Sequence, residues 1–354
     1  MNTQSNLAFS VMLANMGITY GVDTVEKTFA VSPTVQQKLV DKIVAGNSFL
    51  RDINYVLVDQ IKGEKVIGAV SQAPGSRTDT SDSGERTTTS LLSLGSQDYE
   101  LHPTNYDTHL RYATMNAWAK FKDFQQRYSQ WIMQARIASI IKVGWYGTSA
   151  AATTNATNNP NGEDVNIGWL QKLRAYNSGS QFFSAGAADD GETPPVSLNQ
   201  IRIGSGTGND FVNLDSAVHA CLSMIDPIHQ TDDLVAIIGS ELVSDEKQRV
   251  LTAYGSKPTE KERSEAEAVT SIYAGLPYVK VPGFPARGLL VTALKNLSYY
   301  EQEGSERKQV MDNPKKDRVE NYTQVASGYV VENEEAAAAF EFKNVKLWDG
   351  TNWV

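Results

Sequence analysis

The stretch from Ala113 to Val143, "ATMNAWAKFKDFQQRYSQWIMQARIASIIKV", contains neither glycine nor proline, and its large apolar side chains recur at helical spacing. The residues near one side are Trp118, Phe121, Gln125, Tyr128, Ile132, Ala135 and Ile141, and Phe124 and Trp131 widen this stripe. At about 1.5 Å per residue the helix would run roughly 45 Å, with Gly144 at its end. Such a stripe is more typical of a packing surface than of a cofactor site, so we expect the fold to be built around this helix.

The segment before this helix, from Gln60 to Pro103, is rich in serine, threonine, glycine and aspartate. A sequence of this kind buries too little apolar area to offset its ordering entropy. The strand-like pieces Val66–Val70 and "YELHPTNYDTHLRY" (residues 99–112) flank it and could pair as the legs of a long hairpin. Long projections of this sort are usually functional or disordered, and composition alone does not separate a hairpin from a floppy surface loop.

The first 30 residues read as a separate short helical element, whose apolar pattern ends near Gly17 and Gly21. A second helix is expected to begin at Ser32 and Pro33 and to stop at Gly46, before the strand-like "INYVLV". The apolar stripe of this second helix consists of Val35, Leu39, Ile43 and Val44.

The chain after the long helix mixes helices and strands. Residues 147–210 are poor in pattern apart from a short helix in "IGWLQKLRAYN" (residues 167–177), and helices are expected from Leu214 to Ile225 and from Glu241 to about Thr252. The C-terminal pieces "RVENYTQV", "GYVVE" and "AAFEFKNVKLW" alternate as in an antiparallel sheet. Together these elements predict an α+β protein.

The overall composition limits which class of protein this can be and in which cellular compartment we expect it. The chain has 354 residues, of which 32 are Lys or Arg and 41 are Asp or Glu, so its net charge is −9. A dedicated DNA-binding surface normally shows a basic excess instead. Cys221 is the single cysteine, so no intrachain disulfide can form and a reducing cytoplasm fits best. The N-terminus has no basic residue before Lys27, unlike a secretion signal, and no apolar run is long enough to span a membrane. We therefore expect a soluble, intracellular protein.

No pattern in the chain indicates a catalytic, cofactor or metal site. His219 and Cys221 would point in opposite directions on a helix, and Cys221 lies in an apolar run typical of a buried thiol. His102 and His109 lack further ligands at zinc-site spacing. The glycine-rich "IRIGSGTGND" (residues 201–210) has Asn209 where a dinucleotide-binding loop needs glycine, so a tight turn is expected. A paired-acid hydrolase is not favoured, because the acidic pairs adjoin turns.

The run "DNPKKDRVENYTQV" (residues 312–325) interleaves cations with anions and then becomes strand-like. It could be a nucleic-acid patch, a catalytic cluster or a mixed-charge edge that contacts another protein. The run lacks the interleaved aromatic residues of a single-strand stacking platform, and acids balance its cations.

Eight blocks of the sequence, in this order and over nearly the whole chain, resemble the major capsid proteins of peduovirus-type tailed phages. They are "KTFAVSPTVQQKL" (27–39), "FLRDINYVLVDQIKGEKV" (49–66), "TDTSDSGERT" (78–87), "YDTHLRYATMNAWAKFKDFQ" (106–125), "VNIGWLQKLR" (165–174), "GLPYVKVPGFP" (275–285), "NLSYYEQEGSERKQVMDNPKKDRVENYTQ" (296–324) and "YVVEN" (329–333). The resemblance implies the Hong Kong 97-type capsid fold. Its expected parts are an N-terminal segment removed on maturation (1–29), an N-terminal arm (30–55), an extended loop (56–110), a spine helix and peripheral domain (111–213), an axial domain (214–312) and peripheral return strands (313–354).

The resemblance also implies a structural protein and not an enzyme. Its copies would form the hexamers and pentamers of an icosahedral head around double-stranded phage DNA, without cofactor or membrane, in the cytoplasm of a host bacterium. Implied partners are a scaffolding protein, a maturation protease that cuts near Phe29 and Ala30, a portal protein and, optionally, a decoration protein. On this hypothesis the mixed-charge run contacts a neighbouring subunit through Lys315, Lys316, Asp317, Arg318 and Glu320.

Three alternatives remain open from the sequence. A bacterial nanocompartment shell, as formed by encapsulins, shares the fold, and a cargo enzyme inside the particle would distinguish it. A DNA-binding protein would show a steep salt dependence of its affinity for duplex DNA. A hydrolase using His219 or an acid pair would lose activity when that residue is replaced while particles still form.

Overall fold

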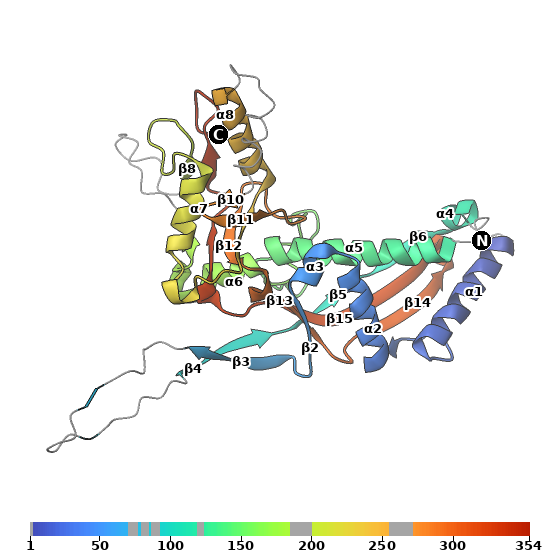
Figure 1. Cartoon of the computed structure of the whole chain (residues 1–354). Helices are drawn as coiled ribbons and strands as arrows, with labels where there is room; N and C mark the ends of the chain where they lie inside the picture. Colours follow the sequence, from blue (N-terminus) through green and yellow to red (C-terminus); the bar gives the residue numbers. More distant parts are fainter. Residues whose placement is uncertain are drawn as a thin grey trace.

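The computed structural model describes residues 3–69, 77–78, 85, 93–118, 124–184, 200–254 and 272–354. Figure 1 shows three parts: an elongated body in which helix α5 lies along a sheet, a second sheet domain that stands at one end of α5, and a hairpin that projects away from both. This mixed architecture confirms the predicted α+β class.

The sheet of the body has seven strands. Its order is β1-β14-β15-β13-β2, and β5 and β6 also pair with β15. β13 and β2 run parallel, and the remaining pairs are antiparallel. The strands are β1 (Phe29–Ala30), β2 (Asn54–Val58), β5 (His102–Asn105), β6 (Thr108–Arg111), β13 (Leu297–Gln302), β14 (Arg307–Asn313) and β15 (Arg318–Val331).

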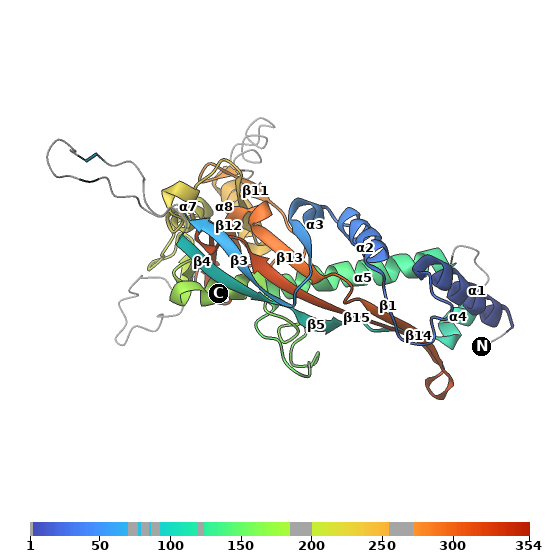
Figure 2. The ribbon, with the colours of Figure 1, turned by 90° about the horizontal axis from the view of Figure 1, so that it is seen from below.

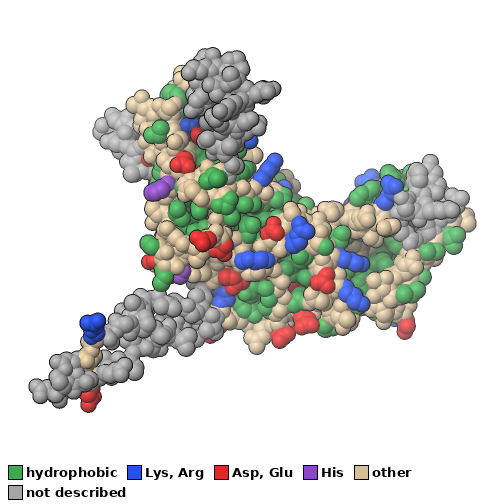
Figure 3. Space-filling view, in the orientation of Figure 1, with side chains coloured by type: hydrophobic (Ala, Val, Ile, Leu, Met, Phe, Trp, Pro, Cys, Tyr) green, Lys and Arg blue, Asp and Glu red, His purple; other side chains and the backbone are tan. Residues whose placement is uncertain are grey.

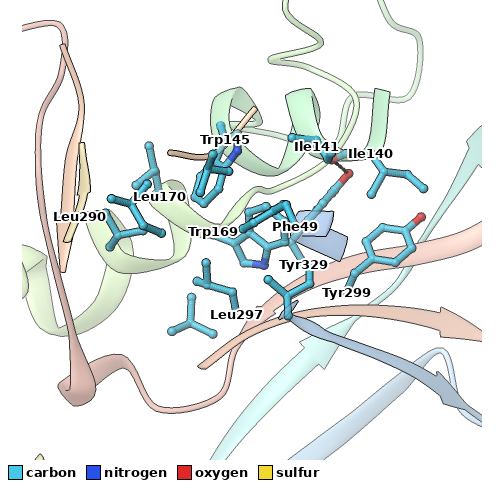
Figure 4. Close-up of a cluster of buried hydrophobic side chains, with 14 of the residues drawn as sticks. Phe49, Ile140, Ile141, Trp145, Trp169, Leu170, Leu290, Leu297, Tyr299 and Tyr329 are labelled. Carbon is cyan, nitrogen blue, oxygen red and sulfur yellow. Dashed lines mark hydrogen bonds between the residues drawn. The ribbon is translucent and has the colours of Figure 1, made fainter. Parts of the chain in front are cut away.

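Four helices pack on or beside this sheet: α2 (Pro33–Ala45), α3 (Ser48–Asp52), α5 (Phe124–Tyr146) and α6 (Trp169–Ala175). In their core, drawn in Figure 4, the ring of Trp169 lies 4.8 Å from that of Trp145 and 5.1 Å from that of Tyr329, centroid to centroid. The indole of Trp169 donates a hydrogen bond to the carbonyl of Ser298 at 2.8 Å, so its one polar atom is satisfied inside the core.

The helix predicted over 113–143 corresponds to α4 (Tyr112–Trp118) and α5, and residues 119–123 between them lie outside the described part. Gly144 does not end α5, which continues to Tyr146. A Cβ atom at Gly144 would lie 2.3 Å from the ring of Trp169, so the glycine permits close packing of α6 instead of marking a helix end. The predicted stripe is also only partly buried, because Ala135 is exposed and Trp131 is 50% exposed.

The second domain contains a six-stranded sheet of order β10-β11-β9-β12-β16-β7. Helices α7 (Leu214–Ser223) and α8 (Ser240–Tyr254) belong to it, together with the parallel pair β8 (Ile201–Ile203) and β17 (Val345–Leu347). Its strands are β7 (Phe182–Phe183), β9 (Leu234–Ile238), β10 (Ile272–Tyr273), β11 (Leu276–Val279), β12 (Leu289–Ala293) and β16 (Ala337–Phe340). The expected boundary between an axial domain (214–312) and peripheral return strands (313–354) does not match the sheets. β13 and β14 precede that boundary but lie in the body, and β16 follows it but lies in this second domain.

The projecting hairpin consists of β3 (Lys62–Ala69) and β4 (Ser93–Glu100), which pair antiparallel in a sheet of their own. The second leg is thus residues 93–100, and not 99–112 as expected. Residues 102–111 instead join the body as β5 and β6, since β15 is long enough to pair with both in succession. The expected hairpin tip falls largely outside the described residues. Within the described part, none of the helices is long and apolar enough to cross a membrane.

Candidate assembly surfaces

The projecting hairpin is anchored at its root by Lys65. The Lys65 ammonium donates hydrogen bonds to the carbonyls of Val331 and Glu332 and lies 3.4 Å from a carboxylate oxygen of Glu334. Its side chain is only 8% exposed. Because a buried ammonium needs such partners, this contact ties the root of the hairpin to the body. Among the described strands, β3 and β4 pair only with each other.

The mixed-charge run forms the end of the β14–β15 hairpin, with Asp317 in the left-handed conformation at the turn (φ 49°). Arg318 and Glu320 contact each other at 2.6 Å within the chain, and Tyr322 donates a hydrogen bond to the same carboxylate. Hydrogen bonds from Tyr322, Arg318 and Asn313 lower the pKa of Glu320 to about 2. Of the five predicted contact residues, Lys315, Lys316 and Asp317 are therefore the exposed ones, whereas Glu320 is buried in its own hairpin.

Phe29 and Ala30 form β1, an edge strand of the body. Phe29 lies opposite Lys308 and Ala30 opposite Arg307, and the Val31 amide continues the pairing to the carbonyl of Glu306 at 2.8 Å. Ala30 is exposed and Phe29 is half-buried. The segment before it, which includes α1 (Thr3–Tyr20), packs beside α4 and the β14–β15 hairpin, as Figure 2 shows.

A buried charge cluster lies between α5 and the sheet, and the sequence analysis did not single it out. The guanidinium of Arg136 is 3.1 Å from Glu301 and 3.3 Å from Glu306, and the ammonium of Lys308 is 3.0 Å from Glu306. Burial opposes the charge of Arg136, but the two carboxylates outweigh it and raise the pKa of this guanidinium. Arg136 lies four residues from both Ile132 and Ile140, so it falls on the apolar side of the helix. A charged residue at that position was the sequence signal from which the buried charge cluster could have been predicted.

The residues considered for chemistry do not converge. Cys221 is fully buried, its thiol contacts the carbonyl of Ala338, and burial raises its pKa to about 12, whereas His219 is exposed. His102 and His109 lie on separate strands, and the described residues contain no group of three or more potential metal ligands. The glycine-rich turn packs on Trp348, since a Cβ at Gly206 would lie 2.4 Å from that ring. The chain reverses here as expected for a tight turn, because the amides of Asp210 and Phe211 both donate to the carbonyl of Arg202 at 3.0 Å.

A long helix on a mixed sheet, a projecting hairpin and an N-terminal segment packed on the edge of that sheet favour one class of protein, the shell-forming subunit. The chain belongs to the phage major capsid protein, P2 family, whose profile matches residues 8–342. It is therefore a structural protein of a tailed-phage capsid and not an enzyme, which sets aside the alternative functions considered from the sequence.

Individual relatives agree with this assignment. The chain is 35% identical to the capsid proteins of Escherichia phage P2 over 358 aligned residues, covering 99% of this chain and 96% of the relative. It is 28% identical to the major capsid protein of Serratia phage KSP20, covering 91% and 88% of the two chains. Among solved structures, a chain of the satellite phage P4 procapsid, determined with its size determination (Sid) protein, superimposes with a TM-score of 0.74 at 32% identity, covering 99% of this chain and all of that chain.

Proposed function

We propose that the chain assembles as hexamers and pentamers into a closed icosahedral head around double-stranded phage DNA. The observation that carries this proposal is the β3–β4 hairpin, which projects from the body in Figure 1 and pairs with no other strand among the described residues of its chain. Such a hairpin gains its contacts from a neighbour, and a two-stranded hairpin is marginal alone. The full chain expressed with its scaffolding protein should form closed shells in negative-stain micrographs. A population of solitary subunits under those conditions would contradict the proposal.

We infer that a maturation protease cuts between Phe29 and Ala30. Proteins that recognise a peptide commonly bind it as an added extended strand. Phe29 and Ala30 meet this requirement, because they form an edge strand whose second edge is unpaired among the described strands. The expected product has Ala30 at its N-terminus, which intact mass and N-terminal sequencing of mature shells would establish. Mature shells that retain residues 1–29 would refute the inference.

The end of the β14–β15 hairpin is the proposed contact with a neighbouring subunit. Arg318 is unsuitable for a test, because reversing its charge would disturb Glu320 in the same chain. Lys315→Glu with Lys316→Glu changes only exposed side chains and should lower shell yield while the subunit stays folded. Each exposed contact is worth about 0–1 kcal/mol, but the contact repeats at every interface. Lys38→Glu, an exposed change on α2, is the control, and unchanged yield from the double variant would exclude the contact.

The remaining partners follow from the same proposal: a scaffolding protein, a portal protein and optionally a decoration protein, with assembly in the host cytoplasm. The packaged DNA would be confined without sequence-specific contact. A net charge of −9 supports this view, and Figure 3 shows cationic and anionic side chains interspersed on one face of the body. Stoichiometric binding of duplex DNA by unassembled subunits at physiological salt would count against it.

A further inference from the structure

The carboxylate of Glu334 lies at the root of the projecting hairpin and is only partly satisfied there. Its Oε1 atom is 3.4 Å from the ammonium of Lys65, which is longer than the roughly 2.8 Å of a good charge-assisted hydrogen bond. Its Oε2 atom is buried and has no hydrogen-bond partner among the described residues. Glu334 therefore has an oxygen available for a second donor.

Lys172 on α6 is a second cation at this place. Tyr176, which caps the C-terminus of α6, follows Lys172 by four residues and so lies on the same side of the helix. The Tyr176 hydroxyl donates a hydrogen bond to Glu335 at 3.0 Å, so this side of α6 adjoins the short 3₁₀ helix η5 (Glu334–Ala336). Lys172 is half-buried, and its ammonium makes no hydrogen bond or ion pair with any other described residue.

Lys65 and Lys172 act on each other and on the same carboxylate. Burial lowers the pKa of Lys172, the charge of Lys65 lowers this pKa further, and the charges of Glu334 and Glu100 raise it. Glu100 is 48% exposed and already pairs with Lys62 at 2.8 Å. Glu334 is therefore the buried carboxylate for which the two lysines compete.

The two lysines stand on parts of the chain that are held differently. α6 is fixed in the body, because Trp169 and Leu173 on this helix are fully buried. Lys65 stands on β3, which pairs only with β4 among the described strands. A change in the angle of the hairpin would therefore carry Lys65 away from Glu334 and leave Lys172 in place. A buried carboxylate that loses its only cation is strongly destabilised, so such a change needs a replacement cation.

We propose that Lys65 and Lys172 exchange at Glu334. Lys65 holds the carboxylate in the present position of the hairpin, and Lys172 takes it over when the hairpin turns about its root. The present position is the more stable one, because Lys65 also donates hydrogen bonds to the carbonyls of Val331 and Glu332. Lys172 is thus a positioning residue that keeps Glu334 paired while the hairpin changes its angle. The exchange is a property of the single chain and depends neither on processing nor on assembly.

Hydrogen exchange of the unassembled full chain tests this proposal. The probes are the backbone amides at the root of the hairpin, among them that of Leu101, which donates to the carbonyl of Ile61 at 2.8 Å. Lys172→Met should slow their exchange by about tenfold, because the turned position loses its cation. A lysine that only supported the root would give faster exchange when removed. Lys38→Met, an exposed change on α2, is the control and should leave these rates unchanged.

A double variant separates the exchange from simple repulsion between the two lysines. In the parent chain, Lys172→Met should not lower the urea midpoint, because Lys65 still holds Glu334. In a Lys65→Met chain, the same change should lower the midpoint, because Glu334 then loses its last cation. Repulsion alone predicts no effect of Lys172→Met in that background, because the second lysine is already gone.

Three results would overturn the proposal. The first is unchanged or faster exchange of the root amides in Lys172→Met. The second is a Lys65→Met chain whose midpoint does not respond to Lys172→Met. The third is a Lys65→Met chain that fails to fold, since Lys172 should keep Glu334 paired there.

Discussion

The guanidinium of Arg136 on α5 lies 3.1 Å from the carboxylate of Glu301 on β13, and the two side chains are only 8% and 0% exposed. Glu301 also accepts hydrogen bonds from the amide of Gln36 at 2.7 Å and from the hydroxyl of Tyr55. The cluster thus joins α2, β2 and α5 to one carboxylate of the sheet. Buried ion pairs of this kind are costly to break, because the remaining partner stays out of water without compensation.

Replacing Arg136 by methionine should therefore destabilise the subunit by about 3–5 kcal/mol, because Glu301 would remain buried without its cation and Glu306 would keep only Lys308. Urea unfolding of the unassembled chain measures the loss. Gln134→Ala, an exposed change on the same helix, should stay within about 0.5 kcal/mol of the parent. A similar midpoint for the two variants would show that the cluster adds little to stability.

Gly144→Ala separates two opposed effects in α5. Helix propensity alone favours alanine by about 1 kcal/mol, but the added Cβ would lie 2.3 Å from the ring of Trp169. Overpacking of this kind costs about 1–3 kcal/mol, so we expect a net loss of stability and a changed near-ultraviolet circular dichroism signal from the tryptophans. A more stable variant with an unchanged spectrum would contradict the packing role of Gly144.

Lys65→Met should loosen the root of the projecting hairpin. Glu334 and the carbonyl of Val331 would lose a buried donor, at a cost of about 1–3 kcal/mol, and the yield of closed shells should fall more than subunit folding does. The matched control is Lys62→Met on the same strand, because the pair of Lys62 with Glu100 is exposed and worth about 0–1 kcal/mol. Equal shell yields from the two variants, measured by sedimentation and electron microscopy, would argue against a positioning role.

The hydrogen bonds that Tyr322 and Arg318 donate to Glu320 predict a specific pH dependence. The pKa of Glu320 falls from its ordinary 4.5 to about 2 in the folded chain, so its carboxylate contributes stability above about pH 4.5 and loses that contribution as the pH falls toward 2. Glu320→Gln should therefore differ from the parent in urea midpoint at pH 7, and the difference should shrink at pH 3. Glu303→Gln, in an exposed turn, is the control. A difference that does not change with pH would exclude ionisation as its cause.

Several elements were predictable because their signals are local. The helix α2 begins after Ser32 and ends before Gly46, as the proline and glycine indicated, and α6 and α7 also lie where periodicity placed them. The buried side of α2 was not predictable in the same way. It contains Gln36, a polar residue outside the expected stripe, because the partner of Gln36 is a carboxylate in β13.

The sequence by itself determined the positions of most helices and strands, and membership of a capsid family through ordered blocks of residues. The tertiary structure alone decided which polar side chains are buried together, which glycine serves close packing, and which strand edge the N-terminal segment covers. The physical reason is distance along the chain. Arg136 and Glu301 are 165 positions apart, and apolar periodicity reports which face of an element is buried but not what it is buried against.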